Sequence, residues 1–504
     1  MALALALPLA LVALGAVLRW SATPPFGSDF DEYRLVAREL LDSGRPLVAG
    51  VEATKYPLGY PLILAAFSVA GLPVTGTAMA LNLVLVGALG AVVVALSWPT
   101  GHVAPANHPI GGSPGADSRA RGGGVAAVPA AVYAVAGAGV WGSVYVVMPD
   151  LGFLVLAGLV LWRTSELTAP RHVWQLSALV AGAVLLKSTG VLVALAASVA
   201  VFFAGRPLRR LAWVPVAAGV GLTGLMAAFN APYPEHTTGY ARTFFLVQAT
   251  DSAQGEVTLA GIAGRLVERA DLVLRDVGFA LAGVGVPTPW SWLIGLTLVA
   301  AGAWALRRPP ARRAYVLAFL ALWLPAMALW PYSSVRFQLP LVPLAAVGVG
   351  WLAAEAVRRL GRAGAVVVVA VLGAYLANSA VELRTEAAAE AARVGAVATD
   401  TEKTVAWAET HIPEGEVVAS LAYREIAYRL DRPVVALGYT TDMDQLWRDA
   451  LAGDARWLVV MPSLYGSRGA IERRLVDAYP DRLRLAYDTP TVDTYELVVD
   501  SARP

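Results

Sequence analysis

Apolar runs of bilayer length recur along most of this chain, and they constrain its fold more than any other feature of the sequence. About 20 apolar residues cross the hydrocarbon core of a bilayer as a helix, because a helix satisfies its own backbone hydrogen bonds there. The pattern predicts a polytopic α-helical membrane protein with about 11 transmembrane helices. The runs lie at about 2–19, 76–97, 125–147, 151–162, 173–186, 189–204, 211–229, 287–306, 314–330, 338–356 and 364–380.

The composition agrees with this class. Of the 504 residues, 57% are hydrophobic and 15% are charged, whereas soluble proteins carry roughly 25% charged residues. The net charge of +2 is too close to zero to indicate a nucleic-acid partner. The chain has no cysteine, which excludes disulfides and cysteine–metal sites.

The first apolar run is expected to stay in the membrane as a helix. No Lys or Arg precedes it, although a signal peptide usually has a basic start and a small-residue cleavage site. Arg19 and Trp20 follow it, and such a pair is typical of a membrane interface. A signal anchor has a similar profile and stays an alternative.

Basic residues are concentrated in alternate loops, which indicates how the chain crosses the membrane. With a cytoplasmic N-terminus, all the loops rich in Arg fall on the cytoplasmic side, as the positive-inside rule requires. This assignment needs segment 58–73 to be interfacial or re-entrant, and its shortness and its opening Gly59 and Pro61 favour that reading. The basic loops are 98–124, 163–172, 205–210, 307–313 and 357–363.

The same assignment places the other connections on the outer face of the membrane. The chain after residue 381 also lies outside in this scheme. The outer connections are 20–57, the turn at Asp150, 187–189, 230–275 and 332–336.

The composition changes near residue 381, which predicts two domains, 1–380 in the membrane and 381–504 outside it. In the second part, short apolar stretches such as 416–419 and 457–461 alternate with amphipathic ones. This alternation predicts a small extracytoplasmic α/β domain with one sheet. It has no glycine-rich phosphate loop or nucleophile elbow, so we expect a binding or scaffolding role.

Three carboxylates stand together in the first outer loop, at Asp29, Asp31 and Glu32. The apolar spacing of 31–44 predicts an amphipathic helix on the membrane surface. Acids in its first turn could simply cap the helix and complement its dipole. Charge beside a bilayer is costly to hold, so we favour a functional role for Asp29 or Asp31, and less so for Glu32.

Asp150 is a second acid at the predicted outer face, at the start of an apolar run. A helix N-cap is an equally good interpretation. Two separate carboxylates could divide the work of a reaction, because one can act as a general base while the other orients an acceptor or a divalent cation.

Basic residues are rare at the predicted outer face, and each could bind a phosphate group electrostatically. Interfacial anchoring is the simpler alternative for each of them. It is harder to defend for Lys187, which stands within an apolar stretch. His236 and Tyr240 with Arg242 would suit a loop that covers a substrate. The basic residues are Lys55, Lys187, Arg242 and Arg336.

The order of these motifs resembles the GT-C superfamily, in the branch of protein O-mannosyltransferases and lipid A aminoarabinose transferases. Asp31-Glu32-Tyr33, followed by Lys55-Tyr56-Pro57-Leu58, is similar to the first external loop of that family. Pro149-Asp150-Leu151 resembles its second acidic site. Arg336-Phe337 with Leu339-Pro340-Leu341-Val342-Pro343 resembles its late Arg-Tyr-x-x-Pro-x-x-Pro segment.

The resemblance covers most of residues 1–360, with two departures. Tyr56 replaces a proline that is frequent in the family, and Phe337 replaces a common tyrosine. Neither change removes a charge, but both leave the branch and the transferred sugar open.

The resemblance implies an inverting transfer of a mannose- or arabinose-type sugar from a polyprenyl-phosphate donor at the outer face of the cell membrane. Asp31, or Asp29 if the register differs, would activate the acceptor. Asp150 would assist, with or without a divalent cation such as Mg²⁺ or Mn²⁺. Lys55 and Arg336 would hold the lipid phosphate, with Lys187 as a further candidate.

The resemblance leaves the acceptor open among a glycan, a protein and a lipid, and other function classes remain. A transporter or flippase for lipid-linked sugars would predict internal repeats and polar residues at the membrane midplane. The polar residues gather at the outer face instead. A non-catalytic membrane scaffold would leave the acids and Lys55 of the first outer loop unexplained.

Overall fold

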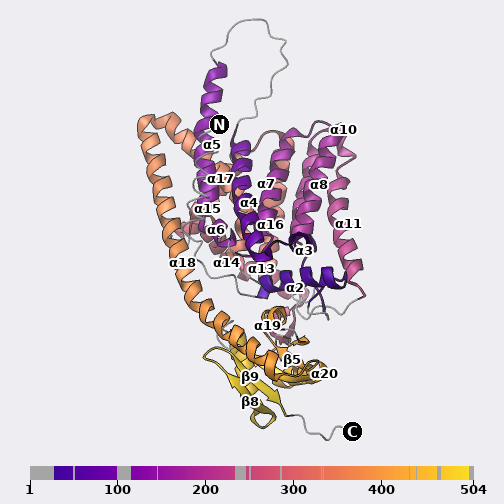
Figure 1. The fold of residues 1–504 in the computed structure, drawn as a ribbon. Coiled ribbons are helices and arrows are strands. Elements are labelled where there is room, and N and C mark those ends of the chain that lie inside the picture. The colour runs from indigo at the N-terminus through magenta and orange to yellow at the C-terminus, as the bar shows by residue number, and fades with distance from the viewer. Residues whose placement is uncertain are drawn as a thin grey trace.

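The computed structural model shows a bundle of long helices, with one helix that runs along its side to a small sheet (Figure 1). The residues that it describes are 28–48, 52–98, 115–144, 146–232, 246–248, 251–283, 286–330, 332, 334–430, 432–438, 440–461 and 467–498. The predicted first transmembrane run, 2–19, lies outside the described residues, as do His236, Tyr240 and Arg242.

The predicted apolar runs within the described residues are helices, so the prediction of a mostly helical chain is confirmed. Run 125–147 is divided, with a break at Gly137, and the first of its two helices begins ten residues earlier than the run. The helices are α4 (Val74–Ser97), α5 (Gly115–Ala136), α6 (Ala138–Val144), α7 (Asp150–Arg163), α8 (Pro170–Leu186), α9 (Gly190–Phe203), α10 (Arg206–Arg209), α11 (Trp213–Asn230), α15 (Trp290–Ala305), α16 (Pro310–Leu329), α17 (Val342–Leu360) and α18 (Arg362–His411).

Within the described part of the chain, five segments are long and apolar enough to cross a membrane. Several other apolar helices are shorter than a bilayer requires. The total of eleven spans therefore stays a prediction. The five segments are Val74–Ser97, Arg206–Asn230, Pro310–Leu329, Val335–Leu360 and Arg362–Thr385.

The bundle core is built by close helix–helix contact and stacked aromatic rings. At Gly302 of α15, an added Cβ would lie 1.9 Å from the Leu344 carbonyl oxygen of α17, so only glycine allows this approach. Phe319 and Trp323 of α16 stack with ring centroids 5.2 Å apart, and Phe153 of α7 stacks on Trp323 at 6.1 Å. These contacts fix α7 and α16 relative to each other, and the start of α7 and the end of α16 line the same cavity.

Segment 230–275, predicted as an outer loop, contains regular structure that the apolar pattern does not reveal. A short hairpin is formed by β3 (Leu246–Gln248) and β4 (Asp251–Glu256), and the helices α13 (Leu259–Glu268) and α14 (Ala270–Ala282) follow. Both helices are shorter than a membrane span and carry charges, so they do not stand out as apolar runs. The inner face of α14 is buried in the bundle core.

The first outer loop folds as a helix, a small hairpin and a second helix. These are α2 (Ser28–Asp42), the antiparallel pair β1 (Leu47–Val48) and β2 (Glu52–Ala53), and α3 (Gly59–Val69). The helix predicted over 31–44 is therefore present, three residues earlier at its start. Figure 1 shows α2 lying across the end of the bundle, between the bundle and the sheet.

The chain after α17 continues as α18, a single helix of 50 residues, so the boundary predicted near residue 381 lies inside a helix. After α18 come β5 (Val417–Ser420), α19 (Tyr423–Arg429), β6 (Val434–Ala436), α20 (Met443–Ala452), β7 (Ala455–Val460), α21 (Ser467–Ala478), β8 (Leu483–Asp488) and β9 (Asp493–Leu497). We call residues 417–498 the C-terminal α/β unit.

The strands of this unit form one sheet in the order β6-β5-β7-β9-β8. β5 pairs in parallel with β6 and β7, and β9 pairs antiparallel with β7 and β8. Helix α19 follows β5, which lies between β6 and β7 in the sheet, and it packs on α2. The sheet thus presents one of its helices to the first outer loop of the bundle.

Candidate active site

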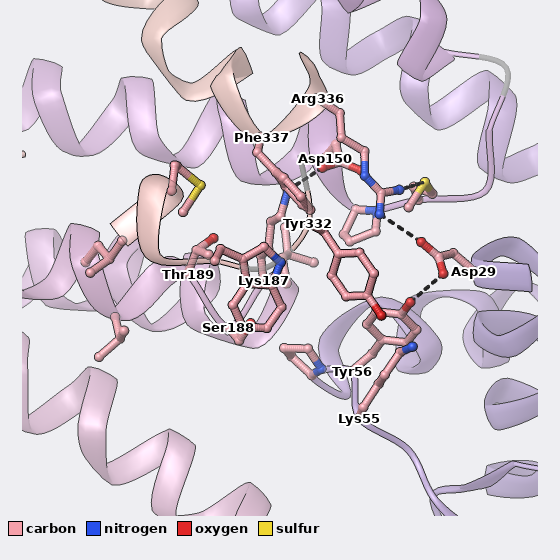
Figure 2. A pocket seen from close by; sticks show the side chains of 18 of the residues that line it. Asp29, Lys55, Tyr56, Asp150, Lys187, Ser188, Thr189, Tyr332, Arg336 and Phe337 are labelled. Carbon is pink, nitrogen blue, oxygen red and sulfur yellow. Dashed lines mark hydrogen bonds and ion pairs between the residues drawn. The ribbon is translucent and has the colours of Figure 1, made fainter. Parts of the chain in front are cut away.

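A cavity of about 600 Å³ opens at the end of the bundle that carries α2. Its walls come from α2, the segment after β2, the start of α7, the turn between α8 and α9, the end of α16 and the 3₁₀ helix η2 (Val335–Leu341). The structure brings together six of the residues singled out in the sequence, shown in Figure 2: Asp29, Lys55, Tyr56, Asp150, Lys187 and Arg336.

Asp29, in the first turn of α2, is held by two donors. Arg336 donates from Nη2 to its Oδ2 at 2.8 Å, and the Tyr56 hydroxyl donates to its Oδ1 at 2.6 Å. The Asp29 side chain keeps 23% of its surface exposed. The carboxylate is therefore oriented by the protein and still reachable from the cavity.

Asp150 and Lys187 form the second ion pair of the cavity, with 2.5 Å between Oδ1 and Nζ. Asp150 opens α7 and Lys187 follows the last residue of α8, so each charge sits at the helix end whose dipole stabilises it. Figure 2 shows Arg336 lying between Asp150 and Asp29. The charges thus alternate in sign across the cavity wall.

The tight turn that presents Lys187 depends on Gly190. A Cβ at this position would come within 2.6 Å of the backbone nitrogen of Val184 in α8. Lys187 itself is in extended conformation, which ends α8 and directs the chain around the turn. The turn at residues 187–189 was placed at the outer face from the sequence, and its side chains line the cavity.

Both carboxyl groups are held in the anionic form. Burial raises the pKa of Asp29, but the charges of Arg336 and Lys55 and the hydrogen bond from Tyr56 lower it by more. The pKa of Asp29 therefore lies well below its usual range. Burial also raises the pKa of Asp150, and Lys187 and Arg336 together bring it below its ordinary value. The cavity therefore contains two carboxylates at neutral pH.

Lysine and arginine side chains in the cavity lie near aromatic rings. Lys55 Nζ is 5.1 Å from the centre of the Tyr56 ring. Lys187 Nζ and Arg336 Cζ lie 5.2 and 5.3 Å from the Phe337 ring. An aromatic face near a cation limits its orientations without neutralising it.

Part of the cavity wall is apolar and differs from the charged part in composition. This apolar wall comes from the start of α9 and the end of α16. Such a lining suits a hydrocarbon chain, whereas the ion pairs suit a phosphate and a sugar. The apolar lining residues include Val191, Leu192, Ala326, Met327 and Leu329.

Asp31 and Glu32 do not line this cavity. Both side chains are fully buried between α2 and α19. Asp31 pairs with Arg34 and with Nη1 of Arg429, the latter at 2.9 Å, and Glu32 pairs with Arg424 Nε at 2.6 Å. Their contacts join two parts of the protein.

Several cavity residues were not singled out from the sequence as site residues. Ser188 and Thr189 follow Lys187 in the sequence, and Trp330 and Tyr332 precede Arg336. Because they are close in sequence to predicted site residues, they could have been predicted from the sequence. Arg424 comes from the C-terminal α/β unit. No local pattern marks it, because its place in the cavity depends on how α19 packs on α2.

A divalent cation finds no ready-made site in this arrangement. Among the described residues there is no cluster of three or more His, Cys, Asp or Glu side chains that could bind a metal ion. The two cavity carboxylates each already face a cation of the protein. A divalent cation would therefore have to compete with Arg336 for Asp29 and with Lys187 for Asp150.

Solved structures share the architecture over the whole chain. ArnT from Cupriavidus metallidurans bound to undecaprenyl phosphate matches with a TM-score of 0.57 and 14% identity, covering 100% of this chain and 99% of that one. The chain has the ArnT fold. The apo form of ArnT gives a TM-score of 0.59 at 13% identity, with 96% and 97% covered. The resemblance to the GT-C superfamily is thus confirmed for the fold.

A second protein with a related architecture is the archaeal oligosaccharyltransferase AglB from Archaeoglobus fulgidus, in complex with an inhibitory peptide and a dolichol-phosphate. It matches the chain with a TM-score of 0.51 at 11% identity, covering 99% of this chain and 75% of AglB. No protein-family model and no curated protein matches the sequence. At 11–14% identity, the similarity to ArnT and AglB is one of fold.

Proposed function

We propose that this chain is an inverting glycosyltransferase at the outer face of the cytoplasmic membrane. It moves a mannose- or arabinose-type sugar from a polyprenyl-phosphate donor to an acceptor hydroxyl. The observation that supports this proposal most is a single cavity lined by Asp29, Asp150, several cations and an apolar wall. This cavity lies in a chain with the ArnT fold. An ArnT structure contains undecaprenyl phosphate, which is the class of lipid proposed here.

The charges of the cavity suit a phosphate leaving group. Its lining holds four cations, Lys55, Lys187, Arg336 and Arg424, against the two carboxylates Asp29 and Asp150. A polyprenyl phosphodiester carries one negative charge, and a second develops on the phosphate as the bond to the sugar breaks. Positive groups fixed at that position before reaction stabilise the transition state.

Asp29 is proposed as the general base. The acceptor oxygen attacks the anomeric carbon from the face opposite the phosphate, and the bond between that carbon and the phosphate oxygen breaks. The hydroxyl proton passes to Asp29, and polyprenyl phosphate leaves with the electron pair of the broken bond. Attack from the opposite face inverts the anomeric centre.

Arg336 connects donor binding with the strength of this base. In the structure it pairs with Asp29 and lowers the pKa of that carboxyl group. A donor phosphate that binds Arg336 shares its positive charge, so the pKa of Asp29 rises towards its ordinary value. The base therefore becomes stronger when the donor is in place.

Asp150 and Lys187 form the second part of the proposed site. Lys187 contacts the phosphate, and Asp150 holds Lys187 in place and orients the acceptor. Lys55 lies on the side of Asp29 and completes the phosphate site. The hydrocarbon tail follows the apolar wall formed by α9 and α16.

The test uses purified protein in detergent with radiolabelled polyprenyl-phosphate mannose or arabinose. Two quantities are measured in parallel: binding of the donor, and release of polyprenyl phosphate in the presence of a cell-envelope extract as the acceptor source. Release by the wild type and its loss in Asp29→Asn support the proposal. Donor binding without release from either protein, with all acceptor fractions tried, would favour a transporter of lipid-linked sugars.

A further inference from the structure

Helix α19 of the C-terminal α/β unit brings an arginine into the wall of the cavity. Arg424 lines the cavity, and its side chain is only 3% exposed. Its Nε lies 2.6 Å from Oε2 of Glu32, a side chain of α2 that is fully buried. Arg424 is thus fixed to α2, the helix that also carries Asp29.

Glu32 in turn holds the segment with Lys55 and Tyr56. Its Oε1 accepts a hydrogen bond from the Thr54 hydroxyl at 3.4 Å. The backbone N–H of Tyr56 donates to the Thr54 hydroxyl oxygen at 3.1 Å. A continuous series of contacts therefore runs from α19 through α2 to two residues of the cavity.

Glu32 is also close to Asp29 along α2. Residues three apart in a helix lie on neighbouring positions of its surface, so Glu32 stands next to Asp29 on α2. The Tyr56 hydroxyl donates to Asp29, which closes the series of contacts into a ring. Arg424 contacts this ring at Glu32 and comes from outside the bundle.

Other contacts hold α19 to α2 without reaching the cavity. Arg38 donates from Nη2 to the Ala427 carbonyl oxygen at 3.1 Å. The Arg34 guanidinium lies 4.2 Å from the centre of the Tyr428 ring. Arg38 and Tyr428 are not among the cavity lining, so they allow attachment of the unit to be separated from its effect on the cavity.

We propose that Arg424 is a positioning residue, through which the C-terminal α/β unit completes the phosphate site. Arg424 holds Glu32, and Glu32 with Thr54 sets the position of Lys55 and Tyr56. Removal of the arginine leaves the buried Glu32 carboxylate without its closest cation, so it must move or take up a proton. Lys55 and Tyr56 then lose their fixed positions. This inference rests on the function proposed above for the cavity.

The experiment uses the full chain with Arg424→Gln, Glu32→Gln and the double variant, and Arg38→Gln as the control that weakens only the attachment. Dissociation constants for polyprenyl phosphate, KM and kcat for the donor, and the melting temperature are measured for each. We expect Arg424→Gln to weaken polyprenyl-phosphate binding by about 10- to 100-fold, because the loss of one hydrogen bond to a charged group changes a dissociation constant by about that factor. Binding by Arg38→Gln should stay within about twofold of the wild type.

The double variant gives the decisive comparison. Because Arg424 and Glu32 are proposed to act through one contact, the double variant should bind no more weakly than the weaker single variant. Additive losses would mean that the two residues act separately and would overturn the proposal. Equal losses in Arg424→Gln and Arg38→Gln, following the melting temperature, would reduce Arg424 to a simple attachment.

The same data separate this inference from the proposed function. If the wild type binds polyprenyl phosphate but transfers no sugar, the proposed reaction fails while the effect of Arg424 on binding is still measured. If the wild type transfers sugar and Arg424→Gln does so with an unchanged donor KM and unchanged polyprenyl-phosphate binding, the positioning role fails and the reaction stands.

Discussion

Two groups of paired charges meet at α2, and their surroundings differ. The cavity group consists of Asp29, Asp150, Lys55, Lys187 and Arg336. The interface group consists of Asp31, Glu32, Arg34, Arg424 and Arg429. The first borders a space of about 600 Å³. In the second, Asp31 and Glu32 are fully buried, Arg429 is only partly exposed, and Arg424 reaches the cavity edge.

The comparison shows that paired charges of the same types can serve two purposes. Side chains beside an open space can exchange a protein partner for a substrate. Side chains enclosed between α2 and α19 cannot, so their pairs hold the two elements together. Asp29 and Asp31 are two residues apart, which is about 200° around a helix, and this rotation places them in different groups.

The largest effect is expected for the base of the cavity group. Asp29→Asn removes the proton acceptor but keeps the size of the side chain, so transfer should fall by about 10²- to 10⁴-fold. The melting temperature should change little, because Asp29 is partly exposed. Sugar transfer and thermal unfolding are measured on the same preparation. Transfer at the wild-type rate would remove Asp29 from the mechanism.

The matched change in the interface group should act on stability. Asp31→Asn leaves Arg34 and Arg429 without their carboxylate in a buried contact, and breaking such a pair costs about 3–5 kcal/mol. We expect a lower free energy of unfolding, with the rate per folded molecule nearly kept. A stable Asp31→Asn protein without transfer activity would instead make Asp31 the base.

A rise in pH should lower the stability of the contact between α19 and α2. Glu425 of α19 is buried, and burial first and then the neighbouring Asp31 raise its pKa to about 8, despite Arg424 and Arg429. The native chain thus keeps a proton that the unfolded chain releases near pH 4.5. The free energy of unfolding should therefore fall as the pH rises from about 4.5 to about 8.

Glu472 provides the control for this pH dependence. It is buried in the C-terminal α/β unit with a pKa of about 7, so it contributes with the same sign but reaches its limit about one pH unit earlier. Glu425→Gln should flatten the dependence between pH 7 and 8 more than Glu472→Gln does. Thermal unfolding of the full chain across this range measures both. An unchanged slope in Glu425→Gln would place the titration elsewhere.

The smallest effect is expected for the second donor to Asp29. Tyr56→Phe removes one hydrogen bond to the carboxylate, worth about 1 kcal/mol or roughly fivefold in rate. Because this bond lowers the pKa of Asp29, the acid limb of the pH–rate profile should move to higher pH. A profile that does not move would indicate that Arg336 alone sets the charge of Asp29.

The sequence was sufficient to predict the helical class, the helix of the first outer loop and the residue types that meet at the cavity. Charged residues in the predicted outer connections stand out, and five of them line the cavity together with Tyr56. The face of α2 could not be predicted, because α2 packs on both sides. Tyr33 and Ala37 lie against the bundle, and Leu35 and Val36 against the C-terminal α/β unit.

Other features could not be predicted because they arise from contacts between distant segments. Arg424 is nearly 400 residues from Glu32, and nothing in its local sequence indicates the contact. Helices α13 and α14 were missed because each is too short and too charged to be recognised as a membrane run. The apolar pattern detects segments long enough to cross a bilayer, but not shorter helices such as these.

The unbroken helix α18 sets the position of the C-terminal α/β unit relative to the bundle. Its 50 residues extend about 75 Å at 1.5 Å per residue, and they join the α17 end of the bundle to the C-terminal α/β unit. One inserted residue would turn everything beyond it by about 100°, and α19 would no longer face α2. Seven residues would nearly restore the rotation but would lengthen the helix by about 10 Å. The length of this rod therefore sets both the angle and the height at which Arg424 meets the cavity.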